Sequence, residues 1–154
     1  MRRVRSADTV PEMVLRSILH QLGFRFRLHP GKLPGKPDVV LPKHNTVIFM
    51  HGCFWHRHKN CPRAATPATR QEYWIPKFQR TVKRDKSNRA KLRRKGWDVI
   101  TVWECELEKP EVLARKLSNL IDNAASKYHI PMVEFLKAAE ERAVYKVKTK
   151  RKKR

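Results

Sequence analysis

A segment over residues 49–61 constrains this chain more than any other. It follows an apolar run and contains three of the seven histidines, two of the three cysteines and an adjacent aromatic pair. Such a segment can hold a metal, transfer protons or present flat side chains to a partner. Its residues, in order, are Phe-Met-His-Gly-Cys-Phe-Trp-His-Arg-His-Lys-Asn-Cys.

The charge of the chain indicates a polyanionic partner. There are 36 basic and 14 acidic residues among 154, for a net charge of +22. Seven of the last nine residues are basic, and removing these charges leaves +15. The length predicts one domain over residues 1–145, followed by a basic, disordered tail over 146–154. Nucleic acid is the first candidate partner and an anionic membrane surface the second.

The cellular context follows from what the sequence lacks. No apolar run approaches the ~20 residues that cross a bilayer, and no apolar signal core follows the N-terminus. Three cysteines cannot all pair, so a thiol or metal role in a reducing compartment fits better than a disulfide scaffold. We therefore predict a cytoplasmic, nucleoid-associated protein with no membrane partner.

The first half of the chain reads as a helix followed by strands. Asp8 or Thr9 can cap a helix that ends at Gly23, because apolar residues recur there at helical spacing. Alternation predicts a strand over 24–28, before a loop rich in proline and glycine. The remaining elements expected here are a hairpin of two strands, over 38–41 and 46–50, of which the second is covered on both faces.

The second half is expected to be mainly helical. Thr69 is a candidate cap for a helix interrupted or restarted at Pro76. The other expected elements are a basic helix over 77–95, a strand over 97–103, a helix from Pro110 and a shorter helix over 131–143. The charges of the basic helix can lie along phosphates or form a solvated face. The whole pattern predicts an α/β fold with a mixed central sheet covered by helices.

The cysteines suggest a metal centre. Cys53, His58 and Cys61 have the spacing C-x4-H-x2-C, and Cys105 ends the strand over 97–103. Three thiolates and one imidazole make a closed tetrahedral zinc site of the structural kind. The alternative is three buried free cysteines and a surface histidine.

A second group suggests acid and base chemistry. Asp38 starts one strand, and the neighbouring strand delivers His51 and His56. Together they can bind Mg²⁺, orient a water and supply a base near neutral pH, although an aspartate after proline is also a common turn residue. Glu12 is a candidate further acid, and the alternative role of a glutamate in a first helical turn is to stabilise the helix dipole.

The aromatic residues Phe54, Trp55 and Trp74 suggest contact with bases. Phe54 and Trp55 are adjacent in a polar segment, where a core role for both is difficult. Side chains of this kind stack on bases or wedge between base steps. Trp74 is equally compatible with capping the hydrophobic core.

Five motifs together resemble the very short patch repair (Vsr) endonuclease family. They occur in the family's order over roughly residues 8–108, and the HGCFWH block is highly specific. They are LPGKPD at 33–38, VIFMHGCFWHRH at 47–58, PATRQEYW at 67–74, KRD at 83–85 and GWDVITVWECEL at 96–107.

This resemblance implies a restriction-endonuclease-like fold and a Mg²⁺-dependent enzyme. Such an enzyme nicks one strand of duplex DNA 5′ to the thymine of a T:G mismatch, which arises when 5-methylcytosine deaminates. It implies that Asp38 and the backbone carbonyl of Met50 hold Mg²⁺. It also implies that His51 and His56 are the catalytic histidines, of which His56 is favoured to activate water, and that Glu12 supports the site. Further implied roles are the zinc ligands Cys53, His58, Cys61 and Cys105, and an aromatic wedge of Phe54, Trp55 and Trp74.

Two other functions stay open at this point. One is a zinc-stabilised DNA-binding module that recognises distorted duplex without cutting, and the other is a related nicking enzyme with another target. A monomer is expected, because one nick needs one site, and mismatch-repair proteins are candidate partners. Only residues 1–7 precede the first helix, where family members commonly carry a longer basic stretch.

Overall fold

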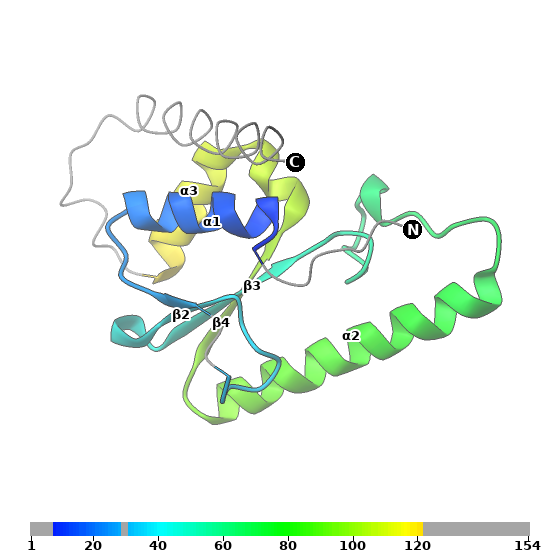
Figure 1. Cartoon of the computed structure of the whole chain (residues 1–154), viewed down its shortest axis with the longest axis horizontal. Helices are drawn as coiled ribbons and strands as arrows, with labels where there is room; N and C mark the ends of the chain where they lie inside the picture. The colour runs from blue at the N-terminus through cyan, green and yellow to red at the C-terminus, as the bar shows by residue number, and fades with distance from the viewer. Residues whose placement is uncertain (1–7, 29–30, 122–154) are drawn as a thin grey trace, which may run out of the picture. The chain divides into compact units, whose positions relative to one another are not determined.

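A computed structural model describes residues 8–28 and 31–121 (Figure 1). These residues form two compact units, one over 8–25 and 106–121 and the other over 26–105. The helix predicted over 131–143 and the tail over 146–154 lie outside the described residues. Within the described part of the chain, no helix combines the length and the hydropathy needed to cross a membrane.

The first unit is a pair of helices, α1 (Val10–Gln21) and α3 (Pro110–Ile121), which pack against each other. Thr9 caps α1 as predicted, since its Oγ1 accepts a hydrogen bond from the amide of Glu12. Leu15, Ile18 and Leu19 of α1 are fully buried. The helical spacing of apolar residues therefore identified the packed face correctly.

The end of α1 explains why the predicted strand over 24–28 is too long. Gly23 has φ +82°, its amide bonds to His20 O, and the amide of Phe24 bonds to Leu19 O. These two bonds form a Schellman motif, which uses the backbone of Phe24 to terminate the helix. The observed strand, β1, is only Arg27–Leu28.

The second unit contains a mixed four-stranded sheet in the order β1-β2-β3-β4. β2 (Val39–Leu41) pairs antiparallel with β1 and with β3 (Thr46–His51), so the predicted hairpin is confirmed. β4 (Asp98–Trp103) pairs parallel with β3. β3 is buried on both faces, as its continuous apolar sequence predicted. Short 3₁₀ turns occupy Pro42–His44, Pro62–Ala64 and Glu104–Glu108.

The parallel pairing of β3 and β4 positions the functional residues. His51 at the end of β3 pairs in register with Trp103 at the end of β4. Because parallel strands end at the same edge of a sheet, the segment after β3 and the residues after β4 meet there. Side chains separated by about fifty positions in the sequence thus become neighbours.

Helix α2 (Gln71–Arg94) corrects two expectations. It is one uninterrupted helix of 24 residues through Pro76, and its N-cap is Arg70 rather than Thr69, with no side-chain cap hydrogen bond. Pro76 is the sixth residue of the helix, so the bond that it cannot make would reach the carbonyl of Glu72 in the first turn. Both residues are exposed, so water can satisfy that carbonyl and the helix continues.

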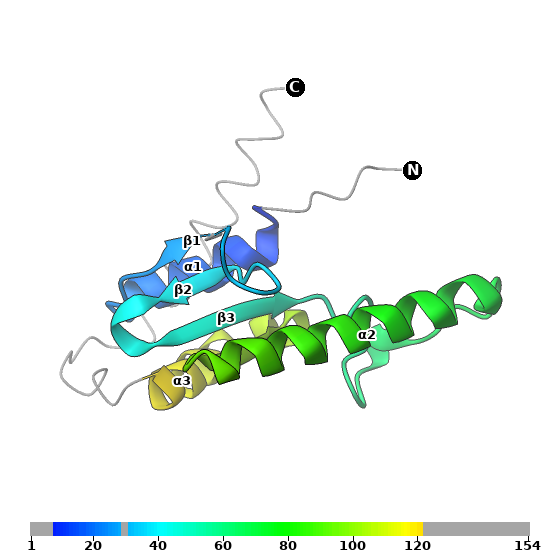
Figure 2. The same ribbon diagram turned by 90° about the horizontal axis from the view of Figure 1, so that it is seen from below.

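The C-terminal half of α2 packs on the sheet, while its N-terminal part extends beyond the strands (Figure 2). Leu92 joins a buried cluster with Val40, Val47 and Phe49. The helix ends at Arg94, and Gly96, the predicted stop, follows its cap with φ +84° and an amide that bonds to Arg93 O. The long helix is thus anchored at one end, and its other half is free to carry a functional surface.

Gly35 gives a test of how the loop before β2 meets α2. It has φ +76°, and a Cβ placed there would lie 2.9 Å from the Cβ of Asn88 on α2. We expect Gly35→Ala to lower the free energy of unfolding by about 3 kcal/mol, from backbone strain plus overpacking. The control is Gly96→Ala, which has the same backbone strain and open space around it, and should cost about 1 kcal/mol. Urea titration measures both, and equal losses would contradict the close contact.

Candidate active site and metal centre

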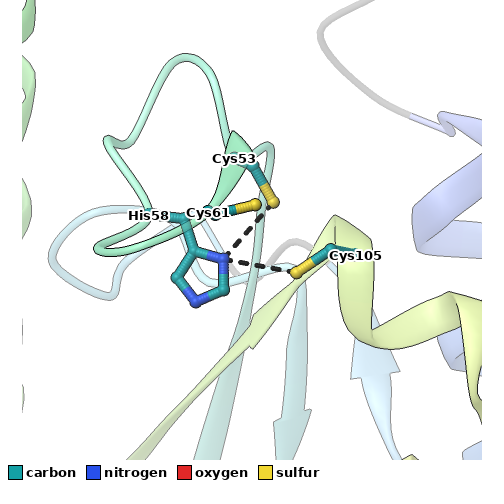
Figure 3. A group of neighbouring side chains, drawn as sticks. All are labelled: Cys53, His58, Cys61 and Cys105. Atoms are coloured by element: carbon teal, nitrogen blue, oxygen red, sulfur yellow. Dashed lines mark hydrogen bonds between the residues drawn. The ribbon is translucent and has the colours of Figure 1, made fainter. Parts of the chain in front are cut away.

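The predicted grouping of three cysteines and a histidine is confirmed. The ligand atoms of Cys53, His58, Cys61 and Cys105 all lie within 4.8 Å of one another (Figure 3). His58 Nδ1 is 3.6 Å from Cys53 Sγ and 3.3 Å from Cys105 Sγ. Three of these residues come from the segment after β3, and Cys105 follows β4, so the group joins the two strand ends.

The donor set fits a metal ion. Burial, followed by hydrogen bonding with the neighbouring thiols, raises the pKa of Cys53 to about 12. Three thiolates around one imidazole would repel one another without a cation between them, and a bound cation favours that ionised form. The His58 ring stacks on Trp103 with its centroid 4.2 Å away, which fixes the orientation of the imidazole. The group can hold a metal, and it does not match the alternative of three buried free cysteines and a surface histidine, because Cys61, Cys105 and His58 are all half-buried.

Asp38 lies beside the end of β3. Its Oδ2 accepts a hydrogen bond of 2.7 Å from the amide of Met50, and its own amide bonds to Ile48 O. The carboxylate is therefore held against the backbone of the residue that precedes His51. Asp38 and the Met50 backbone together offer oxygen donors of the kind that hard cations prefer.

The two histidines of the predicted active site are in contact. The rings of His51 and His56 stack with centroids 3.8 Å apart and planes 12° apart. His51 is only 6% exposed, and its ring also meets the edge of Trp103 at 5.4 Å. Burial, then the proximity of His56, lowers the pKa of His51 to about 3, so this imidazole is neutral near pH 7.

Asp85 is a residue of this site that sequence reasoning did not assign. Its Oδ2 is 2.6 Å from Nδ1 of His56. Burial raises the pKa of Asp85, but the hydrogen bond and charge of His56 outweigh it, and the net shift is downward. The carboxylate is therefore ionised, and Nδ1 of His56 donates to it. The available signal was that Asp85 is the single acid among eight basic residues between positions 82 and 95.

Glu12 belongs to the unit of α1 and α3, and its carboxylate makes hydrogen bonds with nearby residues of that unit. Its carboxylate accepts hydrogen bonds from the Asp8 amide at 3.0 Å, from Thr9 Oγ1 at 2.9 Å and from Arg16 at 3.1 Å. These bonds tie the Glu12 carboxylate to the start of α1, which matches the alternative role in helix stabilisation. Its predicted support of the active site stays a prediction.

The aromatic residues form one cluster. Phe54 meets Trp55, Trp74 and Phe78 edge-on, at centroid distances between 5.1 and 5.5 Å. Trp74 also stacks on buried Phe78 at 5.7 Å, whereas Trp55 is 39% exposed. Trp74 thus rests on a buried ring, which fits the alternative of capping the core, and its predicted contact with bases stays a prediction.

A lysine holds the exposed side of this cluster. The Lys77 ammonium lies 5.1 Å from the Trp55 and Tyr73 ring centroids and 5.6 Å from that of Trp74. It also donates a hydrogen bond of 3.0 Å to the Tyr73 hydroxyl, and this bond lowers the pKa of Tyr73. Contacts of a cation with several rings orient those rings.

Comparison with known proteins identifies the family. The family model described as DNA mismatch endonuclease Vsr matches residues 1–63. The type II nicking enzyme V.XorIIP of Xanthomonas oryzae pv. oryzae is 46% identical over 122 residues, which cover 79% of this chain and 89% of that protein. For V.NmeAIP of Neisseria meningitidis, also a type II nicking enzyme, the identity is 38% over 121 residues, 79% of this chain and 86% of the relative.

The DNA mismatch endonuclease Vsr of Escherichia coli is 43% identical over 113 residues, 73% of this chain and 72% of that protein. Sequence, site geometry and relatives agree, and this chain belongs to the Vsr family of DNA mismatch endonucleases.

Proposed function

We propose that this protein is an endonuclease that nicks one strand of duplex DNA 5′ to the thymine of a T:G mismatch, in a Mg²⁺-dependent hydrolysis. The observation that carries the proposal is the His51–His56 stack with Asp85 on Nδ1 of His56, at the end of β3, where the Asp38 carboxylate accepts a hydrogen bond from the Met50 amide. The relatives named as mismatch endonuclease and nicking enzymes support the reaction class. A restriction-endonuclease-like fold is part of the proposal, supported by the mixed sheet with Asp38 directly before a strand.

The roles follow from the contacts. Asp38 and the backbone carbonyl of Met50 would hold Mg²⁺, which when bound neutralises charge on the scissile phosphate. His56 donates through Nδ1 to Asp85, so Nε2 is the atom that takes a proton from the attacking water. His51, neutral and buried, supports the His56 ring and contacts the phosphate as a hydrogen-bond donor.

The metal centre is proposed to hold zinc in a structural role. Three cysteine thiolates and one histidine are the donor set of closed tetrahedral zinc sites, which leave no position for water. The site would fix the segment after β3 to the end of β4. It would thereby keep His56 and the aromatic cluster in place without taking part in the chemistry.

The aromatic cluster is proposed to enter DNA beside the mismatch. Trp55 is exposed and Trp74 half-exposed, and both are rigid, flat side chains. A T:G wobble pair stacks less well than a Watson–Crick pair, so separating it from its neighbour costs less than the few kcal/mol of an intact step. Deformability of the DNA would therefore contribute to specificity.

Duplexes with T:G, C:G or T:A at one position, with and without Mg²⁺, test the proposal. We expect nicking of the T:G duplex only, and only with Mg²⁺. Equal nicking of all three duplexes would support instead a nicking enzyme with another target, which the relatives named type II nicking enzymes bring into consideration. Binding without nicking would indicate a recognition module. Action as a monomer at the nucleoid is part of the same proposal.

Asp85→Asn tests the His56–Asp85 pair. We expect the single-turnover nicking rate to fall roughly 10²-fold or more, because an amide can neither stabilise a protonated His56 nor fix its tautomer. The duplex affinity should change little, since Asp85 faces His56. The control is Asp98→Asn, an exposed aspartate on β4. A nicking rate for Asp85→Asn equal to that of the unaltered protein would show that the His56–Asp85 pair takes no part in the mechanism.

Lys77→Met tests the aromatic cluster. Methionine keeps the apolar stem but removes the cation that orients three rings. We expect the Kd for the T:G duplex to rise about tenfold, with the near-ultraviolet circular dichroism of the tryptophans altered in the free protein. Lys77→Arg should restore most of both. An unchanged spectrum, or no rescue by arginine, would show that Lys77 does not orient the rings.

A further inference from the structure

A groove on α2 shares Phe78 with the aromatic cluster, and its other lining residues take no part in the site described above. It has a volume of about 490 Å³ and lies between the helix and the segment that carries the metal ligands. Its apolar floor is formed by Ile75, Phe78 and Val82, which are three or four residues apart and so share one stripe of the helix. Ile75 and Val82 are 43% and 40% exposed, which is unusual for large apolar side chains on a very basic helix.

The basic rim of the groove is formed by Arg57, Lys83 and Lys86, and none of the described residues that line the groove carries a carboxylate. Arg57 is held in place, because its guanidinium lies 4.3 Å from the Phe78 ring centroid and donates a hydrogen bond of 2.8 Å to Thr66. A positioned guanidinium beside two lysines favours carboxylates or phosphates. The occupant should therefore be anionic and carry an apolar group.

The position of the groove separates it from the proposed DNA surface. Lys86 is nine residues after Lys77, and at ~100° per residue the two side chains project from opposite sides of α2. Lys77 belongs to the aromatic cluster, whereas Lys86 belongs to the groove. DNA that engages the aromatic cluster leaves the groove open on the other side of the helix.

A second copy of the chain does not fit as occupant, because each copy carries +22 and the rim would meet another basic surface. A duplex has anionic groups but lacks the protruding apolar side chain that the floor can bury. We propose that the groove docks a short acidic segment of another protein, with an apolar side chain on the floor and carboxylates on the rim. This inference rests on the proposed function in one respect, because it assumes that DNA binds at the aromatic cluster.

Selection from random dodecapeptides displayed on phage tests this proposal. The target is the full chain with zinc bound, saturated with T:G duplex in buffer without Mg²⁺, so that the proposed DNA surface is occupied. We expect the selected peptides to combine several acidic residues with a large apolar one. Selected peptides without this pattern, or no selection above background, would overturn the proposal.

The selected peptide is then synthesised with a fluorescent label and its Kd measured by anisotropy. We expect the Kd to rise at least about tenfold in Val82→Glu and in Lys86→Glu, and to be unchanged in Lys91→Glu, an exposed lysine outside the groove. Unchanged binding in both groove variants would overturn the proposal. Zinc content and Tm equal to those of the unaltered protein show that each variant is folded.

The same samples distinguish the two proposals from each other. We expect added duplex not to displace the peptide, and the duplex Kd to be unchanged in Val82→Glu. Displacement together with a weakened duplex affinity would assign the groove to DNA and overturn the docking proposal. Nicking of the T:G duplex with Mg²⁺ is measured separately, so absent nicking with intact peptide binding counts against the proposed function alone.

Discussion

Asp38→Asn is expected to lower the single-turnover nicking rate roughly 10³-fold and to leave the duplex Kd within about threefold. Asparagine has the same shape and its Oδ1 can still accept the hydrogen bond from the Met50 amide, which measures 2.7 Å in the unaltered protein. The fold around β2 and β3 should therefore persist. What is lost is the negative charge that would attract a hard cation to the scissile phosphate.

The rate is measured with enzyme in excess over T:G duplex, across a range of Mg²⁺ concentrations. High Mg²⁺ should restore little activity, because the amide is a weaker ligand than a carboxylate. Asp98→Asn is the matched control, since it removes the same charge at an exposed position on β4 of the same sheet. A rate for Asp38→Asn equal to that of the control would show that the hydrolysis does not depend on this carboxylate.

Cys61→Ala is expected to remove zinc and to cost roughly 3 kcal/mol of stability, or about 10 °C in Tm. Cys61 is half-exposed, so its replacement by alanine leaves no cavity in the core. The loss should therefore come from the metal centre and not from packing. Nicking should also fall, because His56 and the aromatic cluster lie in the segment that the centre fixes.

A chelator separates these contributions. Chelation should lower the Tm of the unaltered protein to near that of Cys61→Ala and should leave the Tm of the variant unchanged. Zinc content, measured by atomic emission, should be one per chain before chelation and zero afterwards. A Tm that is the same for both proteins and insensitive to the chelator would contradict a structural metal at this position.

Much of the site was predictable because its residues lie in contiguous motifs. The apolar run before His51 predicted β3, and the spacing of Cys53, His58 and Cys61 predicted the metal group. Cys105 could be added because it follows a strand with clear alternation. The local sequence pattern was sufficient to predict a site residue wherever the end of a strand, or a short spacing between residues, fixed the direction of its side chain.

Other features depend on contacts between distant parts of the chain. Asp85 lies 29 residues after His56, and only the packing of α2 brings them together. The continuity of α2 through Pro76 depends on an exposed first turn, which the sequence does not reveal. Likewise Phe24 alternates with its neighbours as a strand residue would, but its amide is already bonded to the end of α1.

Because β3 and β4 pair in parallel and in register, a change in the length of either strand would disturb the site at their ends. His51 pairs with Trp103, one strand leads to Cys53 and the other to Cys105. Inserting or deleting one residue in β3 would reverse the facing of every residue beyond it and displace His51 and Cys53, and the same change in β4 would displace Cys105 from its partners. The exposed N-terminal part of α2 has no such pairing, so natural variation in chain length should accumulate before that helix and not within the strands.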